Sequence, residues 1–189
     1  PDDVLVAFDE AYYEYVERDD YPQTLKYVHD GRNVIVLRTF SKIYGLAGLR
    51  IGYGISNENV VEVMNKVRQP FNANLIAQAA AQAGLQDTKH VEKSRSTNSE
   101  GKKYLYSKLE ELDLDYVPSE ANFILIHLNR PACRDCGAGR SGQEVTNELL
   151  KLGVIVRPVA GYKFPNSIRV TIGTPEQNQR FIEALREVM

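Results

Sequence analysis

Residues 33–42 read Asn33-Val34-Ile35-Val36-Leu37-Arg38-Thr39-Phe40-Ser41-Lys42, an apolar and β-branched run that ends in a polar segment containing a lysine. An apolar run without polar alternation is typical of a strand buried on both faces of a parallel sheet. A second such run, Val4-Leu5-Val6-Ala7-Phe8, comes earlier and ends in Asp9-Glu10. The interval between the runs has the length of a crossover unit, so we predict two neighbouring parallel strands.

The segments that follow predict a third strand and two helices. Residues 49–55 are interpreted as the strand, and Ser56 or Asn57 can cap a helix that Pro70 stops. An alanine-rich stretch over residues 77–83 indicates the second helix. The apolar face of the first helix is expected to contain Val60, Val61, Met64 and Val67.

The second half of the chain has its own pattern of strands and helices. Residues 92–103 are almost wholly polar, and we place a domain boundary there, with one domain over 1–95 and another over 96–189. The second domain is predicted to be a small α+β unit. Its strands are expected at residues 122–127, 154–156 and 167–172, and its helices at 143–152 and 175–188.

Composition excludes several classes of function. The chain of 189 residues has 23 basic and 25 acidic residues, a net charge of -2, so no overall field would attract nucleic acid or an anionic membrane. No apolar run approaches the roughly 20 residues that cross a bilayer, and the start lacks the order of a secretion signal. We therefore expect a cytoplasmic protein, and the strand-like run that begins three residues after Pro1 indicates a piece of a longer chain.

The two cysteines, Cys133 and Cys136, have C-x-x-C spacing inside a segment over residues 131–142 that we interpret as a surface loop. A structural zinc site needs four ligands, and the sequence contains no second pair. The three histidines also lack the spacing of metal ligands. We therefore expect no metal site.

Asp9 and Lys42 both follow the predicted parallel strands, and in open α/β sheets ligands bind outside the carboxyl ends of the strands. A lysine and a carboxylate placed there suit pyridoxal 5'-phosphate, whose aldehyde forms a Schiff base with a lysine and whose pyridinium nitrogen pairs with an acid. Taken singly, each residue is more often a solvated surface side chain. The case for a cofactor site therefore depends on the sequence around them.

Residues 38–52, RTFSKIYGLAGLRIG, resemble the S-K-x-x-x-[x]-x-G-x-R signature of the class I and II aminotransferases. The resemblance implies that Lys42 carries the cofactor and that Ser41 and Arg50 hold its phosphate, with Thr39 as a weaker candidate. An arginine suits this role because its planar fork can bind phosphate oxygens bidentately.

Asp9-Glu10-Ala11-Tyr12 resembles the D-E-A-Y segment of the same family. The resemblance implies that Asp9 binds the pyridine nitrogen and that Tyr12 hydrogen-bonds the phenolic oxygen of the ring. Two motifs in the right order, one crossover apart, are far more specific than either alone.

Residues 153–174, GVIVRPVAGYKFPNSIRVTIGT, resemble a run found in the histidinol-phosphate aminotransferases. In the wider family the arginine at the position of Arg169 binds the carboxylate of the substrate. Arg157 and Arg169 together would suit the phosphate of histidinol phosphate, since each charged hydrogen bond contributes about 1.5–3 kcal/mol. The alternative is that both arginines lie at strand ends and pair with surface acids.

The resemblance implies an α/β fold: the C-terminal part of a large parallel or mixed-sheet domain of the aspartate aminotransferase type, followed by a small α+β C-terminal domain. It implies a homodimeric transaminase that acts on small molecules, histidinol phosphate and 2-oxoglutarate or glutamate, in histidine biosynthesis. Family members are about twice this length, so the fragment alone is expected to be inactive. The alternatives are another aminotransferase, a threonine-phosphate decarboxylase, or a non-catalytic effector-sensing module of a transcription regulator.

Overall fold

The computed structural model describes residues 3–128 and 140–189, and the chain divides into two compact units. Unit 1 comprises residues 1–94 and unit 2 residues 95–189, so the division falls within the long helix α4 (Thr88–Glu111). Cys133 and Cys136 lie outside the described residues. Across the described ranges, no helix combines the length and the apolar character needed to cross a membrane.

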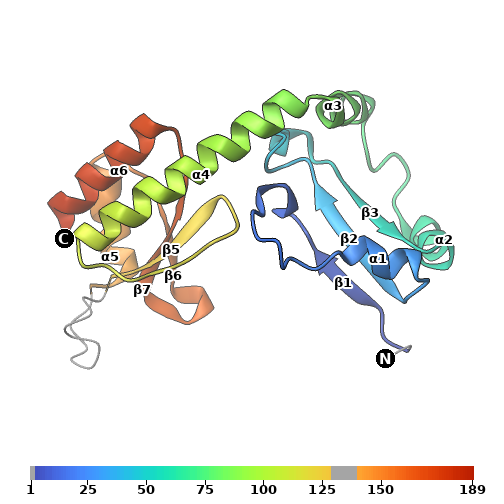
Figure 1. Cartoon of the computed structure of the whole chain (residues 1–189), viewed down its shortest axis with the longest axis horizontal. Helices are drawn as coiled ribbons and strands as arrows, with labels where there is room; N and C mark the ends of the chain where they lie inside the picture. The colour runs from blue at the N-terminus through green and yellow to red at the C-terminus, as the bar shows by residue number, and fades with distance from the viewer. Residues whose placement is uncertain (1–2, 129–139) are drawn as a thin grey trace. The chain divides into compact units, whose positions relative to one another are not determined.

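The sheet of unit 1 is mixed and has the order β1-β2-β3, with β1 at Val6–Asp9, β2 at Val34–Thr39 and β3 at Gly52–Ser56. β1 and β2 are parallel, with Asp9 opposite Leu37, whereas β3 is antiparallel to β2. The predicted parallel pair is thus confirmed. Because parallel strands end at the same edge of a sheet, the segments that follow β1 and β2 leave it side by side (Figure 1).

Three helices complete unit 1: α1 (Thr24–His29), α2 (Glu58–Val67) and α3 (Leu75–Gln86), followed by the first turns of α4. The last two of the three begin at asparagine caps. The side chain of Asn57 accepts from the Val60 backbone N–H at 3.1 Å, and that of Asn74 accepts from Ala77 at 2.8 Å. Each cap satisfies a backbone donor that would otherwise lack a partner inside the helix, which explains where α2 and α3 begin.

Burial in unit 1 differs from the prediction for the first apolar run. Val36 of β2 is fully buried, but Val4 and Leu5 are 47% and 49% exposed and Val6 is 37% exposed. The expectation that this run is buried on both faces is therefore wrong for the described chain. β1 lies at the edge of the three-stranded sheet, so it pairs with a neighbour on one side only. The apolar face of α2 is likewise exposed, with Met64 at 50%.

Two strand predictions also need correction. The third strand begins at Gly52 rather than at residue 49, because residues 47–49 form a 3-10 turn and Arg50 adopts a left-handed conformation that no strand accommodates. The strand predicted over residues 154–156 is wrong. The Val154 N–H instead donates to the Leu149 carbonyl at the end of a helix, and strand pairing starts at Arg157.

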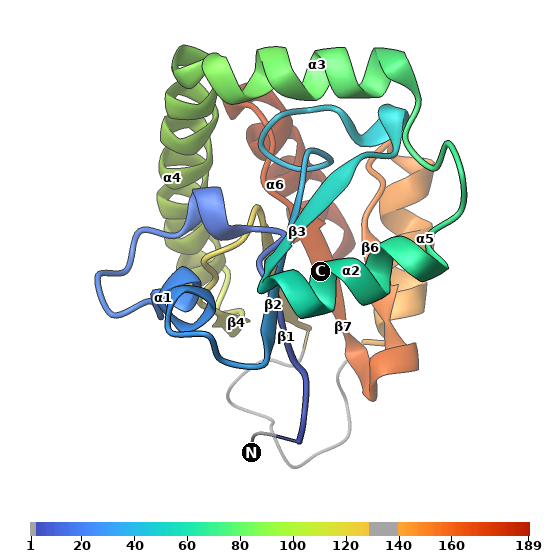
Figure 2. The same ribbon diagram turned by 90° about the vertical axis from the view of Figure 1, so that its right-hand side faces the viewer.

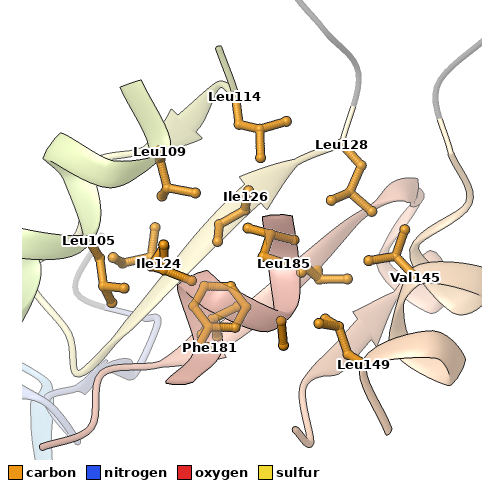
Figure 3. Close-up of a cluster of buried hydrophobic side chains, with 14 of the residues drawn as sticks. Leu105, Leu109, Leu114, Ile124, Ile126, Leu128, Val145, Leu149, Phe181 and Leu185 are labelled. Carbon is orange, nitrogen blue, oxygen red and sulfur yellow. The ribbon is translucent and has the colours of Figure 1, made fainter. Parts of the chain in front are cut away.

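Unit 2 is an antiparallel sheet with the order β4-β5-β7-β6, combined with helices α5 and α6 and the main part of α4, so the predicted α+β unit is confirmed. The core gathers apolar side chains from all three helices and the sheet, among them Leu105 of α4, Ile126 of β5 and Leu185 of α6 (Figure 3). The bounds are β4 Tyr116–Val117, β5 Phe123–His127, α5 Gly142–Lys151, β6 Arg157–Val159, β7 Phe164–Thr171 and α6 Pro175–Val188.

The polar run over residues 92–103 lies inside the continuous helix α4. Two of its polar side chains are buried, Asn98 and Lys102. The Asn98 amide donates to the Ala121 carbonyl at 3.2 Å, and the Lys102 ammonium donates to the Ser119 carbonyl at 3.3 Å. These side chains therefore hold the turn that opens β5, which is why the helix face here is polar and yet buried.

Replacing Leu105 by alanine should lower the free energy of unfolding by about 2–5 kcal/mol, because the fully buried side chain would leave a cavity in the core of unit 2. Chemical denaturation measures this change. Leu150→Ala is the control, since Leu150 is 54% exposed and its truncation should cost less than about 1 kcal/mol. Equal losses for the two variants would contradict this assignment of the core.

Candidate functional site

Asp9 is the last residue of β1, and the chain turns sharply after it. The Asp9 Oδ1 atom accepts from the Ala11 backbone N–H at 3.2 Å. A short 3-10 helix, η1 (Tyr13–Tyr15), follows, with Tyr12 directly before it. A carboxylate that accepts from the backbone two residues on stabilises this kind of turn, so Asp9 sets the direction in which the segment carrying Tyr12 leaves the sheet.

The loop that follows β2 carries Lys42 and is closed by hydrogen bonds. The Gly45 N–H donates to the Lys42 carbonyl and the Leu46 N–H to the Phe40 carbonyl, both at 2.9 Å. Phe40 and Ile43, on either side of the pair Ser41–Lys42, are buried with 4% and 2% exposure. Two buried anchors and two internal hydrogen bonds hold the lysine in a defined place on an otherwise irregular segment.

The segments after β1 and β2 meet at Lys42 and Tyr12. The Lys42 ammonium nitrogen lies 5.1 Å from the centre of the Tyr12 ring, within the range of a cation–π contact. Thr39 is the last residue of β2 and Ser41 belongs to the loop, and the Ser41 N–H donates to the Thr39 hydroxyl oxygen at 3.0 Å. Four of the predicted cofactor residues are thus gathered on the two segments that leave one edge of the sheet, and Asp9 ends the strand beside them.

Arg50 has an unusual backbone. Its φ and ψ are 55° and 52°, and its guanidinium donates to the Ala47 carbonyl at 2.8 Å. A residue with a side chain costs roughly 1–2 kcal/mol in this left-handed region. Such strain concentrates at functional sites, where the surrounding structure holds it in place. Arg50 is exposed and lies at the turn between the Lys42 loop and β3.

Two further elements support the Lys42 loop from outside. Helix α3 runs beside it (Figure 2), and Gly84 of α3 faces the side chains of Tyr44 and Leu46. The His90 Nε2 atom of α4 lies 2.9 Å from the Ile43 carbonyl, so this nitrogen carries the proton and donates it. The sequence indicates of the histidines only that they lack the spacing of metal ligands, yet His90 bonds the residue next to Lys42.

A buried ion pair that sequence reasoning missed lies behind these segments. Glu10 is 2% exposed, and its Oε2 atom accepts from Arg38 Nε at 3.0 Å and from Nη2 at 2.9 Å. Its Oε1 atom accepts from the Thr24 hydroxyl at 2.5 Å. The Arg38 guanidinium also covers the Tyr13 ring at 3.8 Å. The sequence did indicate that Arg38 needs a partner, because it directly follows the apolar residues of β2, and a charge on a buried strand must be paired.

Glu14 and Tyr44 form a second polar contact in the same region. Burial raises the pKa of the Glu14 carboxyl above its ordinary value of 4.5, although the nearby Arg38 charge and a hydrogen bond from Tyr44 oppose the shift. Burial, together with the Glu14 charge, raises the pKa of Tyr44 to about 12. For Arg38, burial lowers the pKa, but hydrogen bonds to Glu10 and Tyr53 outweigh it and the net shift is upward.

Unit 2 contains the two predicted substrate arginines on neighbouring strands. Arg157 of β6 is directly opposite Arg169 of β7, and the Arg169 guanidinium lies 4.8 Å from the centre of the Phe123 ring. Within residues 3–128 and 140–189, neither arginine forms an ion pair with a carboxylate. Like charges directly opposite one another destabilise a sheet. The alternative reading, in which surface acids pair with both arginines, therefore lacks support in the described residues.

Residues 2–185 match the model of the family "Aminotransferase class I and II". The chain is 53% identical over 190 residues to the histidinol-phosphate aminotransferase of Moorella thermoacetica, covering 100% of this chain and 47% of that protein. It is 48% identical to histidinol-phosphate aminotransferase 1 of Nitrosococcus oceani, covering 100% of this chain and 48% of the relative. The chain spans about half the length of these curated relatives.

A solved structure gives the same result for the fold. The histidinol-phosphate aminotransferase of Sinorhizobium meliloti, in complex with pyridoxal-5'-phosphate, superposes with a TM-score of 0.83 at 30% identity, covering 100% of this chain and 49% of that one. The fold is therefore that of the pyridoxal-phosphate-dependent aminotransferases. The chain belongs to the class I and II aminotransferase family.

Because the pKa of Glu14 is raised, this carboxyl should lower the stability of the folded state by an amount that depends on pH. Between its ordinary value of 4.5 and its raised value, the folded state binds more protons at this carboxyl than the unfolded state, so stability falls as pH rises through that window. Glu14→Gln should therefore gain stability relative to the parent as pH rises above 4.5, and the gain should level off once the pH exceeds the raised pKa. Denaturation at a series of pH values measures the difference.

Glu62→Gln is the control, because Glu62 is an exposed residue of α2. Its difference from the parent should not follow the same curve. A Glu14→Gln difference that is independent of pH would contradict the proposed burial cost.

Proposed function

We propose that the protein is a pyridoxal-phosphate-dependent aminotransferase that transfers an amino group between histidinol phosphate and 2-oxoglutarate in histidine biosynthesis. The observation that carries the proposal is the approach of the Lys42 nitrogen to the Tyr12 ring, at the edge of the sheet where Asp9 ends β1. The relatives named histidinol-phosphate aminotransferase at 53% and 48% identity support the particular substrate. A cytoplasmic location is part of the same proposal.

The side chains at this edge fit the cofactor by their chemistry. An amine suits its aldehyde, a carboxylate suits its pyridinium nitrogen, and hydroxyl and guanidinium donors suit its phosphate. When bound, pyridoxal phosphate supplies an electron sink for the α-carbon of the substrate. We assign the amine to Lys42, the carboxylate to Asp9, the phosphate contacts to Ser41, Arg50 and, more weakly, Thr39, and the phenolic oxygen contact to Tyr12.

Lys42 has two roles in this proposal. Its amine would hold the aldehyde of the cofactor, and when it is free of the aldehyde the same amine would move a proton to and from the substrate's α-carbon. A general base must be held within reach of the proton it takes. The closed loop between Phe40 and Leu46 supplies that constraint.

Arg157 and Arg169 are proposed to bind the phosphate of the substrate. Two adjacent cations that have no carboxylate partner among the described residues suit a dianion, and Phe123 limits the positions that the Arg169 guanidinium can take. In terms of domains, we assign residues 1–95 to the C-terminal part of the large cofactor-binding domain and residues 96–189 to the small domain.

We also propose that the full-length protein is a homodimer. Around the turn between α2 and α3, Phe71 is 99%, Leu75 79% and Ile76 74% exposed. Monomeric proteins seldom leave several large apolar side chains of one segment in water. A second copy of the chain is the occupant that we propose for this face. Sedimentation of the full-length protein tests it, and a monomer with these side chains covered by its own chain would contradict it.

Lys42→Ala should abolish the absorption band that the full-length protein acquires with added pyridoxal phosphate, because no other group replaces the amine at this position. We expect retained activity below about 1% of the parent, since both the attachment and the proton transfer depend on one group. Lys66→Ala, at an exposed lysine of α2, is the control and should behave like the parent. An unchanged band in Lys42→Ala would contradict the assignment.

Arg157→Gln and Arg169→Gln should each raise the KM for histidinol phosphate by about 10-fold or more, the equivalent of losing one charged hydrogen bond. Lys151→Gln, at the exposed end of α5, should leave it unchanged. Steady-state kinetics on the full-length protein provide the test. A parent enzyme that prefers an aromatic amino acid to histidinol phosphate would contradict the proposed substrate.

A further inference from the structure

We propose that Glu10 and Arg38 form a positioning pair that holds the Lys42 loop against the segment carrying Tyr12. The proposal rests on the proposed function for its link to the cofactor, but its geometry comes from contacts inside unit 1. Neither residue contacts the Lys42 side chain in any described interaction, so both act through the segments to which they belong.

The pair connects the two segments at their points of origin. Glu10 directly follows Asp9 and stands two residues before Tyr12, whereas Arg38 stands four residues before Lys42. The Glu10 backbone N–H also donates to the Leu37 carbonyl at 2.9 Å, which continues the β1–β2 ladder by one bond. The side-chain pair therefore joins the two segments of the chain next to the last backbone hydrogen bond between β1 and β2.

Each partner is held from several directions. The Glu10 carboxylate accepts from Thr24 of α1 in addition to Arg38. The Arg38 guanidinium is covered by the Tyr13 ring and hydrogen-bonds Tyr53 of β3. Contacts from α1, η1 and β3 restrict the positions that both side chains can take, as a residue pair that positions other segments requires.

A purely structural role explains the pair less well. The Glu10 side chain is 1% exposed and that of Arg38 13%, so both charges are withdrawn from water. The cost of removing two charges from water largely offsets their attraction, and apolar side chains of similar volume often stabilise a fold as well or better. An ion pair at this place is better explained by the fixed, directional geometry that it imposes.

A second contact extends the same connection beyond Lys42. Glu14, four residues after Glu10, accepts a hydrogen bond from Tyr44, two residues after Lys42. The two segments are thus joined before and after the residues that approach each other, Tyr12 and Lys42. Loss of the first connection should therefore loosen the loop without unfolding the unit.

The test is an apolar replacement of the whole pair, Glu10→Leu with Thr24→Val and Arg38→Met, in the full-length protein. Thr24 is included because its hydroxyl would otherwise lose its acceptor. The matched control is Arg140→Met with Glu148→Leu, which removes a partly exposed ion pair of the same residue types in unit 2. The thermal midpoint of each variant shows whether the fold is retained.

Hydrogen exchange without the cofactor is the first measurement. In the triple variant, the amides of Gly45 and Leu46, which close the loop, should exchange about tenfold faster than in the parent, while the core amides of β5 keep their rates. The control variant should exchange like the parent at Gly45 and Leu46. Unchanged exchange in a folded triple variant overturns the proposal.

The absorption of the bound cofactor is the second measurement. The pH at which its band changes should move by roughly half a unit or more in the triple variant, because the surroundings of the Lys42 nitrogen change. A merely structural pair would leave that pH unchanged, and such a result in a folded variant overturns the link to the cofactor. A parent that gains no band contradicts the proposed function itself, and the exchange result then still decides whether the pair holds the loop.

Arg38→Lys covers the case in which the triple variant does not fold. It keeps the charge but loses the planar fork that binds the Glu10 carboxylate through two nitrogens. It should speed the exchange of Gly45 and Leu46 and move the pH of the band in the same direction, by smaller amounts. Parent-like behaviour in both measurements overturns the proposal.

Discussion

The parallel hydrogen bonding of β1 with β2 is the constraint on which the rest of unit 1 depends. Its register places Asp9 opposite Leu37, so the chains that follow both strands leave the sheet at one edge. Had the strands been antiparallel, the segment after Asp9 and the loop with Lys42 would have left at opposite ends. The approach of the Lys42 nitrogen to the Tyr12 ring is a direct consequence of this topology.

Irregular backbone at that edge is made rigid by local interactions. The Lys42 loop is closed by its own hydrogen bonds, anchored by Phe40 and Ile43, and bonded from outside by His90. It leads to the left-handed Arg50, whose strain the surrounding turn supports. A loop held in this way can keep the Lys42 amine in a fixed place, even though the loop is neither helix nor strand.

The sequence correctly predicted the elements that depend on short-range sequence patterns. The apolar run of residues 33–37, the two candidate caps Ser56 and Asn57 and the helical stretch at 175–188 all predicted elements through short-range patterns, and these elements are present, with Asn57 as the cap. Burial of β1 could not be predicted in the same way, because it depends on which other segments cover the strand. The run over residues 154–156 was misread because the end of α5 takes up the Val154 N–H before strand pairing begins. The Glu10–Arg38 pair was missed because the charge of Arg38 next to an apolar run indicates only that a partner is needed, and no local pattern identifies that partner 28 residues away.

The central claim is that the amine of Lys42 is the one that holds the cofactor, and borohydride reduction of the full-length protein with pyridoxal phosphate tests it most directly. Reduction fixes the cofactor to the lysine that binds it, and mass spectrometry of the peptides then identifies that lysine. The account predicts one modified lysine, Lys42, and no modification when Lys42 is replaced by alanine. Stoichiometric modification of another lysine, with Lys42 unmodified, would contradict it.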